Sequence, residues 1–322
     1  MMTTTTQRTT ALRLSIPTKK NSNNIVVIGD GIQGTSVAYH LAKATQQEFI
    51  AKNDSATAIT SITILEAKAP ASAASGKGGG FMARSWGNGT PTQRLHELAF
   101  DMYSEIANEI GCESFRKLPV LSVSPGYNGV EVARKDTTLS PLLPNWLDGN
   151  VGTISAMGYG QDTAQVTPLE FVQKMIQATS DRVSVVLGTC TGIETDPDSE
   201  QENGTRTITA VKYTTQDGGH EALLPADVVI VSAGPWSCAA EQWFQGAVAL
   251  PMEGIKSTSI VWKKPEGDES VDATALFCGE HDQFGTHCKY IYCFIRQFQF
   301  NSNRIKSNQS LNSLIYHIVT LV

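Results

Sequence analysis

The 322-residue chain has no excess of basic residues, because 25 Lys and Arg stand against 31 Asp and Glu for a formal net charge of −6. A surface that binds nucleic acid needs a basic stripe to neutralise phosphates, so the composition argues against nucleic acid as a partner. The chain also lacks any run that approaches the roughly 20 apolar residues of a membrane-spanning helix. We therefore expect a soluble protein of about two domains.

Cysteine is scarce as well, and its spacing excludes the common metal sites. The sequence contains no C-x-x-C pair and no cluster of His and Cys at zinc spacing. The cysteines are Cys112, Cys190, Cys238, Cys278, Cys288 and Cys293. Reduced thiols in the cytoplasm are the simplest interpretation, and the sequence predicts no metal site.

Residues 1–23 differ in composition from the chain that follows. They are rich in Thr, carry Arg8, Arg13, Lys19 and Lys20, and contain no acidic residue. This composition is typical of a transit peptide for a mitochondrion or plastid, and it fits a disordered leader equally well. The sequence leaves both alternatives open.

The stretch IVVIGDGIQG, residues 25–34, is the strongest local signal. Four apolar residues that favour a buried strand run directly into Gly29, Gly31 and Gly34, spaced G-x-G-x-x-G, and apolar residues at helical spacing follow. In a dinucleotide site the first glycine permits the turn, the second lets the backbone approach a diphosphate, and the third lets helix and strand pack closely. The pattern predicts such a site; a βα turn that binds nothing is the alternative.

A second predicted strand, residues 61–65, ends at Glu66. A carboxylate in this place accepts both hydroxyls of an adenosine ribose and disfavours a 2′-phosphate, which argues against NADP. The usual spacing from the glycines is about 20 residues. Because the spacing is longer here, we interpret Gln46–Ala58 as a surface insertion. Taken alone, Glu66 would be a solvated charge at the end of a strand.

The segment ASAASGKGGGF, residues 71–81, contains too many small residues to build a core. Such a run can form a second anion cradle or let a flat ring approach the main chain. A flexible linker is the alternative. A cradle directly after a ribose-binding strand favours FAD over NAD.

Two helices are predicted further along the chain. Between residues 95 and 110 the apolar positions follow one helical face, and Gly111 is placed to end the helix. That face consists of Leu95, Leu98, Ala99, Met102, Ile106 and Ile110. For the second helix Thr167 is the expected cap, Pro168 the first residue and Glu170 the partner in a capping box.

Three strands complete the expected elements. Residues 118–123 include Pro119, which indicates an edge position. Residues 183–187 are predicted to form a strand, and residues 223–231 a buried strand. The latter runs into Ser232–Ser237, at the carboxyl edge of a sheet where open α/β sheets bind ligands.

The last part of the chain is unlike the body. No Asp or Glu follows Asp282, and no glycine follows Gly285. We expect residues 288–322 to be an atypical tail that does not share the core, the product of a truncated or aberrant gene end. Sequencing of the transcript across His287 tests this expectation.

Three blocks, in this order, resemble the D-amino-acid oxidase superfamily of FAD-dependent oxidoreductases: VVIGDGIQGTSVAYHLA, ILEAKAPASAASGKGGGFMA and ADVVIVSAGPWS. The resemblance covers residues 24 to about 260. It implies an α/β fold, in which a Rossmann-like FAD-binding domain (residues 24–95 and 165–243) carries an inserted α+β substrate domain (residues 96–164 and 244–287). The relatives include glycine and sarcosine oxidases and dehydrogenases.

By motif position, the resemblance assigns residues to three parts of the cofactor. The implied FAD-binding residues are Gly29, Gly31, Ile32, Gln33 and Gly34 at the diphosphate, Glu66 and Ala67 at the ribose, Ser75, Gly76, Lys77, Gly78, Gly79 and Gly80 along the diphosphate and flavin, Thr191 at adenine, and Ala233, Gly234 and Trp236 closing over the cofactor. Two features depart from the family. Asp30 puts a carboxylate inside the turn, and the family's last glycine-rich return to the FAD domain is missing.

The resemblance implies that a C–N bond of an amine or amino acid is oxidised by hydride transfer to the flavin. Amino-acid substrates call for an arginine that grips the carboxylate, and Arg84, Arg94 and Arg116 are candidates by location. No catalytic residue is predicted. Two alternatives remain: a flavoprotein-like binding or trafficking protein without turnover, and an NAD-dependent dehydrogenase.

Overall fold

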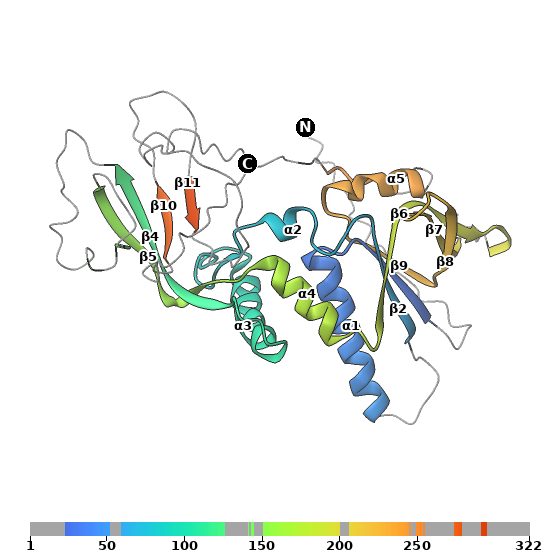
Figure 1. The fold of residues 1–322 in the computed structure, drawn as a ribbon, viewed down its shortest axis with the longest axis horizontal. Helices are drawn as coiled ribbons and strands as arrows, with labels where there is room; N and C mark the ends of the chain where they lie inside the picture. The colour runs from blue at the N-terminus through green and yellow to red at the C-terminus, as the bar shows by residue number, and fades with distance from the viewer. Residues whose placement is uncertain are drawn as a thin grey trace, which may run out of the picture.

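Two β-sheets with helices between them form the body of the protein (Figure 1). A computed structural model describes residues 23–51, 59–125, 141, 143–144, 151–199, 206–244, 246, 249–252, 254, 274–278 and 291–294. Apart from Asn23, the leader expected over residues 1–23 lies outside these ranges, as does most of the tail expected over residues 288–322.

The first sheet has the strand order β8-β7-β6-β2-β1-β9. Its strands are β1 (Asn23–Ile28), β2 (Ile59–Glu66), β6 (Val183–Asp196), β7 (Thr207–Thr215), β8 (Glu221–Pro225) and β9 (Val228–Val231). The neighbouring strands β6, β2, β1 and β9 pair in parallel, whereas β7 pairs antiparallel with both β6 and β8. This arrangement confirms the predicted mixed α/β class.

Both faces of the central strand β1 are buried, as its unbroken apolar sequence predicts. Ile25 and Val27 pack with Ala38 and Ala42 of helix α1 (Ile32–Ala51). On the opposite face, Val26 and Ile28 pack with a cluster that includes Val211 and Ala226. The turn after β1 is therefore held in place from both sides of the sheet.

The second sheet has the order β11-β10-β4-β5-β3. Its strands are β3 (Phe81–Ala83), β4 (Arg116–Pro125), β5 (Val151–Gln165), β10 (Ala275–Cys278) and β11 (Ile291–Phe294). Helices α3 (Gln93–Glu109) and α4 (Pro168–Ala178) share one core with α1, in which Tyr39, Ile106, Phe171 and Met175 are buried. The remaining helices are α2 (Ala74–Lys77), α5 (Ala240–Trp243) and the short 3-10 turns η4 (Pro197–Ser199) and η5 (Gly234–Ala239).

The helix predicted over residues 95–110 is confirmed in position as α3 and corrected in detail. α3 ends as predicted, because Gly111 has a φ of +63° and Cys112 N–H donates to the Ala107 carbonyl at 2.8 Å, a Schellman ending. The predicted apolar face was wrong in its first turns, where Leu95 and Leu98 are exposed. The predicted surface insertion was also wrong at its start, because α1 continues through Gln46–Ala51, a stretch of good helix formers.

The predicted capping box of α4 does not form. Thr167 and Pro168 take the expected cap and first-turn positions, but Thr167 makes no side-chain cap bond. The Glu170 carboxylate instead accepts the N–H groups of Glu113 and Ser114 at 2.8 and 3.2 Å, while Ser114 Oγ accepts the Thr167 N–H at 2.9 Å. Glu170 therefore ties α4 to the segment between α3 and β4.

Two strand predictions are corrected. The run 223–231 is not one strand: β8 ends at Pro225, and Asp227 turns the chain by accepting the Asn24 N–H at 2.8 Å, so that β9 joins β1. Pro119 lies in β4, an interior strand, because β4 is irregular there and its pairing with β10 begins only at Val120. Within the segment predicted as a tail, Ile291–Phe294 forms the edge strand β11, which pairs with β10.

Candidate functional site

The three glycines of the turn after β1 meet different packing demands. Gly29 has a φ of +104°, and a Cβ there would lie 2.6 Å from the Ser232 carbonyl oxygen. A Cβ on Gly34 would overlap the Gly29 carbonyl oxygen and lie 2.6 Å from Ser232 Oγ. A Cβ on Gly31 would meet only the Ser75 hydroxyl, at 3.0 Å. Gly29 and Gly34 thus allow close packing of the backbone, while Gly31 lets the Ser75 side chain approach the turn.

The N-terminus of α1 points out of this turn. The N–H groups of the first helical turn have no carbonyl partner within the helix, which makes a helix N-terminus attractive to anions. Ile32 N–H is met by Ser75 Oγ at 2.9 Å, and Gln33 is exposed. The Ser75 hydroxyl therefore lies where a phosphate oxygen would receive this N–H, so the turn and the glycine-rich segment meet at one place.

Glu66, at the end of β2, braces the same turn. Its Oε2 accepts the Asp30 N–H at 2.8 Å, and its Oε1 accepts the Lys68 N–H at 2.9 Å. A carboxylate oxygen can accept more than one hydrogen bond, so both oxygens keep capacity for the hydroxyls of a ribose. Ala67 follows directly and is exposed. This geometry fits the ribose role that the sequence predicts for Glu66.

Asp30 is completely buried between Gly29 and Gly31. Its Oδ1 accepts the Thr35 hydroxyl at 2.6 Å, whereas its Oδ2 has no hydrogen-bond partner. Burial raises the pKa of Asp30 to about 6, the bond from Thr35 acts against this rise, and the Glu66 charge adds to it. The carboxyl group of Asp30 therefore points into the protein interior and not toward solvent.

The segment predicted as a second cradle begins with the short helix α2 and ends at β3. A Cβ on Gly76 would overlap the Ala71 carbonyl oxygen, and Ala71 itself is a buried non-glycine residue with a φ of +51°. Gly80 has a φ of +68°, and a Cβ there would overlap the Val166 carbonyl oxygen. Lys77 and Gly78 are exposed. Close backbone packing explains Gly76 and Gly80, while the open side of the segment faces solvent at Lys77 and Gly78.

Gln165 connects the glycine-rich segment to β4. Its side chain is buried, its Nε2 donates to the Gly79 carbonyl at 3.0 Å, and its Oε1 accepts from Arg116 Nη2 at 2.8 Å. Arg116 is half-buried, and burial lowers its pKa from the ordinary value. These two hydrogen bonds therefore link Arg116 through Gln165 to Gly79 and hold the backbone of the cradle in place.

Replacing Gln165 by Leu is expected to lower the free energy of unfolding by about 2 kcal/mol, because the half-buried Gly79 carbonyl and Arg116 guanidinium each lose a hydrogen bond. Chemical denaturation measures this change. The matched control is Gln216→Leu, an exposed side chain that donates to the Lys68 carbonyl at 3.2 Å, where the change should stay below about 0.5 kcal/mol. Equal effects at the two positions would contradict a bracing role for Gln165.

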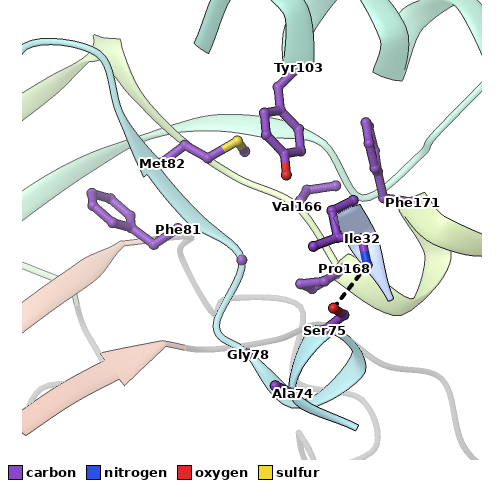
Figure 2. A pocket seen from close by; sticks show the side chains of 11 residues that line it. Ile32, Ala74, Ser75, Gly78, Phe81, Met82, Tyr103, Val166, Pro168 and Phe171 are labelled. Atoms are coloured by element: carbon purple, nitrogen blue, oxygen red, sulfur yellow. Dashed lines mark hydrogen bonds between the residues drawn. The ribbon is translucent and has the colours of Figure 1, made fainter. Parts of the chain in front are cut away.

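A cavity of about 200 Å³ lies where the cradle, α1, α3 and α4 meet. Figure 2 shows Tyr103 pointing its hydroxyl into this space, with Phe81, Met82, Val166 and Phe171 around it. The remaining lining residues are Ile32, Ala74, Ser75, Gly78, Gly80 and Pro168. Burial raises the pKa of Tyr103, so its hydroxyl keeps its proton and can donate. The cavity is apolar, with hydroxyls at Ser75 and Tyr103.

The block after β9 packs directly on the glycine turn. Ser232 Oγ lies 3.1 Å from the Ile28 carbonyl oxygen and 3.3 Å from that of Gly29. Ala233 contributes the next backbone atoms against Gly29. Gly234 and Trp236 belong to η5 and are exposed, with 62% of Trp236 accessible. Thr191 is also exposed, on the part of β6 that has passed beyond β2 and pairs with β7.

The three candidate arginines have different environments. Arg84 Nε and Nη2 donate to the two Asp101 carboxylate oxygens at 3.2 and 3.3 Å in an exposed pair. Arg94 is exposed on α3, and Arg116 is the one tied to the cradle. The sequence did not single out Tyr103 or Gln165, because each is an ordinary polar residue whose role depends on contacts distant in sequence.

Within the described ranges, no helix is long and apolar enough to cross a membrane. The same part of the chain holds no group of three or more His, Cys, Asp or Glu side chains arranged for a metal ion.

Comparison with known proteins gives one family match and several relatives. The model of the family DAO, described as FAD dependent oxidoreductase, matches residues 24–302. A Schizosaccharomyces pombe protein named as an oxidoreductase is 26% identical over 234 residues, which are 67% of this chain and 56% of that protein. The chain thus spans about half the length of this curated relative.

Two solved structures share the fold with a TM-score of 0.53. Glycine oxidase from Bacillus cereus ATCC 14579 is 13% identical, and the match covers 93% of this chain and 78% of that chain. L-proline dehydrogenase from P. horikoshii is 14% identical, with 92% and 77% covered. At these identities the likeness is one of fold.

Proposed function

The chain belongs to the DAO family of FAD-dependent oxidoreductases, and on this premise we propose that it oxidises a C–N bond of an amine or amino acid. The family establishes FAD as the cofactor. We therefore do not propose NAD, the alternative that the glycine turn left open. When bound, FAD supplies the hydride acceptor. The residues of this chain bind and orient the two reactants.

The observation that carries the proposal is that the glycine turn and the cradle, which are distant in sequence, meet at the N-terminus of α1. Ser75 Oγ reaches Ile32 N–H at 2.9 Å, which joins the glycine turn to the cradle, and Ser232 packs on the turn from β9. These segments coincide with the three blocks of the family resemblance. Their contact supports a single cofactor site rather than three unrelated loops.

We assign the parts of this site as follows. The first turn of α1 would receive the diphosphate, Glu66 the ribose hydroxyls, and Ser75–Gly80 the diphosphate and flavin. Gln165 holds the cradle backbone through Gly79. Residues 24–95 and 165–243, which include the first sheet, α1 and α4, would form the FAD domain. Residues 96–164 and 244–287, which include β4, β10 and most of β5, would form the substrate domain. The roles of Thr191 and Trp236 in cofactor binding rest on motif position alone.

The test is the absorbance spectrum of the purified chain after incubation with FAD and removal of free FAD. A retained flavin band and a rise in Tm with FAD concentration are expected, because a ligand that binds the native state stabilises it by mass action. Bleaching of the band by an amine or amino acid without oxygen tests the reaction. An unchanged Tm at saturating FAD would contradict the cofactor assignment.

A second candidate is a flavoprotein-like binding or trafficking protein without turnover. The observation in its favour is Asp30, a buried carboxylate in the turn that would hold a diphosphate. A retained flavin band that no amine or amino acid bleaches would favour this candidate. Bleaching by any one of them would favour the enzyme.

A further inference from the structure

Asp30 occupies the middle of the turn that would receive the diphosphate of FAD, and its carboxyl is sealed from solvent. Oδ1 accepts one hydrogen bond, from the Thr35 hydroxyl, and Oδ2 accepts none. A buried ionised carboxylate with an unpartnered oxygen is costly, since the charged form has lost its water without full replacement. The neutral form removes this penalty.

The surroundings of Asp30 add to the penalty. From the end of β2 the Glu66 carboxylate receives the Asp30 N–H, so a second acid faces the turn. α1 presents the neutral Thr35, and the segment after β2 presents the Ala71 N–H to the Asp30 carbonyl at 2.8 Å. Within the described residues, no Lys, Arg or His hydrogen-bonds to the Asp30 carboxyl. The arriving diphosphate would bring further negative charge to the same turn.

We propose that FAD binding is coupled to the uptake of a proton by Asp30, so that the chain binds FAD more tightly at mildly acidic than at mildly alkaline pH. The proposal rests on the assignment of FAD to this site and adds the regulation of its affinity. Burial already raises the pKa of Asp30 to about 6 in the free chain, which puts its titration within the physiological range. Negative charge placed nearby raises the pKa of a carboxyl further.

The direction of the effect follows from linkage. If the pKa is higher in the complex than in the free chain, binding takes up protons between the two pKa values, and the affinity falls as the pH rises through that interval. Each unit of difference lowers the affinity about tenfold. Below about pH 5 the acid is neutral in both states and the affinity should level off.

The experiment is a titration of the full chain with FAD, followed by flavin fluorescence, between about pH 5 and about pH 8. The affinity of the unmodified chain should fall at least about tenfold across this range, which corresponds to a pKa difference of one unit. Asp30→Asn keeps the size and removes the acid, so its affinity should be nearly independent of pH and higher than that of the unmodified chain at about pH 8. The matched control Asp217→Asn, in the exposed turn between β7 and β8, should keep the full pH dependence.

A second measurement detects the proton itself. Calorimetric titrations at about pH 7 in buffers of different ionisation enthalpy should give roughly 0.4 proton taken up per FAD for a one-unit difference, and near zero for Asp30→Asn. Tight binding with the same pH dependence in Asp30→Asn would overturn the proton linkage and leave the cofactor assignment intact. If the unmodified chain bound no FAD at any pH, both the proton linkage and the cofactor assignment would be overturned.

Discussion

Replacing Gly34 by Ala should lower the free energy of unfolding by about 3 kcal/mol and abolish the retention of FAD. The added Cβ would overlap the Gly29 carbonyl oxygen and lie 2.6 Å from Ser232 Oγ, so β1, α1 and the start of the Ser232 block would have to separate. Overpacking of a closely packed position typically costs about 1–3 kcal/mol, and here the obstacle is backbone that cannot rotate away. The glycine turn would lose the geometry on which the proposed diphosphate site depends.

Helix propensity predicts the opposite sign for this substitution. Gly34 lies in the first turn of α1, where Ala is preferred over Gly by about 1 kcal/mol. The steric term is larger, so a net loss is expected. A net gain in stability would show that the helix and the strand are farther apart than the contacts of Gly34 require.

The measurement pairs chemical denaturation with the ratio of flavin to protein absorbance after gel filtration. Gly192→Ala is the control, because the nearest atom to its added Cβ is the Lys212 Cβ at 3.9 Å, an ordinary contact. It should change stability by less than about 0.5 kcal/mol and leave FAD retention unchanged. If both alanine variants lose FAD equally, close packing at Gly34 is not the cause.

The sequence predicted the elements whose cause is local. The strand–glycine–helix pattern at residues 25–34 and the ending of α3 at Gly111 follow from neighbours in sequence, and both are confirmed. Contacts made by the fold could not be predicted in this way. Glu170 has the right spacing for a capping box but binds the N–H groups of Glu113 and Ser114, which only the packing of α4 brings near.

The same distinction applies to the candidate site. Glycine spacing located the turn and the cradle, yet it could not reveal that Ser75 Oγ meets Ile32 N–H or that Gln165 supports Gly79, since these partners are 43 and 86 residues apart. For Asp30 the sequence identified an unusual acid in the turn but not the direction of its side chain. That direction depends on Thr35 and on burial, and it decides how the acid behaves.

Replacing Asp30 by Asn should raise the free energy of unfolding of the FAD-free chain by about 3 kcal/mol at about pH 8 and leave it nearly unchanged at about pH 4. Burial raises the pKa of Asp30 from 3.8 to about 6. The native state therefore binds a proton more readily than the unfolded state, and the stability that Asp30 contributes when protonated is present below pH 3.8. It is lost as the pH rises through about 6.

The size of the effect follows from the pKa difference, because each unit is worth about 1.4 kcal/mol of stability. Above pH 6 the native state must carry an ionised carboxylate whose Oδ2 has no partner, close to the Glu66 carboxylate. Asn keeps an acceptor for the Thr35 hydroxyl and carries no charge at any pH. The two curves of unfolding free energy against pH should therefore coincide in acid and diverge between about pH 4 and about pH 6.

Urea denaturation at a series of pH values distinguishes this cause from a general effect of charge. Asp217→Asn removes one negative charge from an exposed turn, so its curve should stay parallel to that of the unmodified chain. A constant offset between Asp30→Asn and the unmodified chain at every pH would mean that Asp30 does not titrate in this range. Divergence confined to the interval between pH 3.8 and about 6 would identify the buried acid as a destabilising charge at neutral pH, held in the turn that we propose as the diphosphate site.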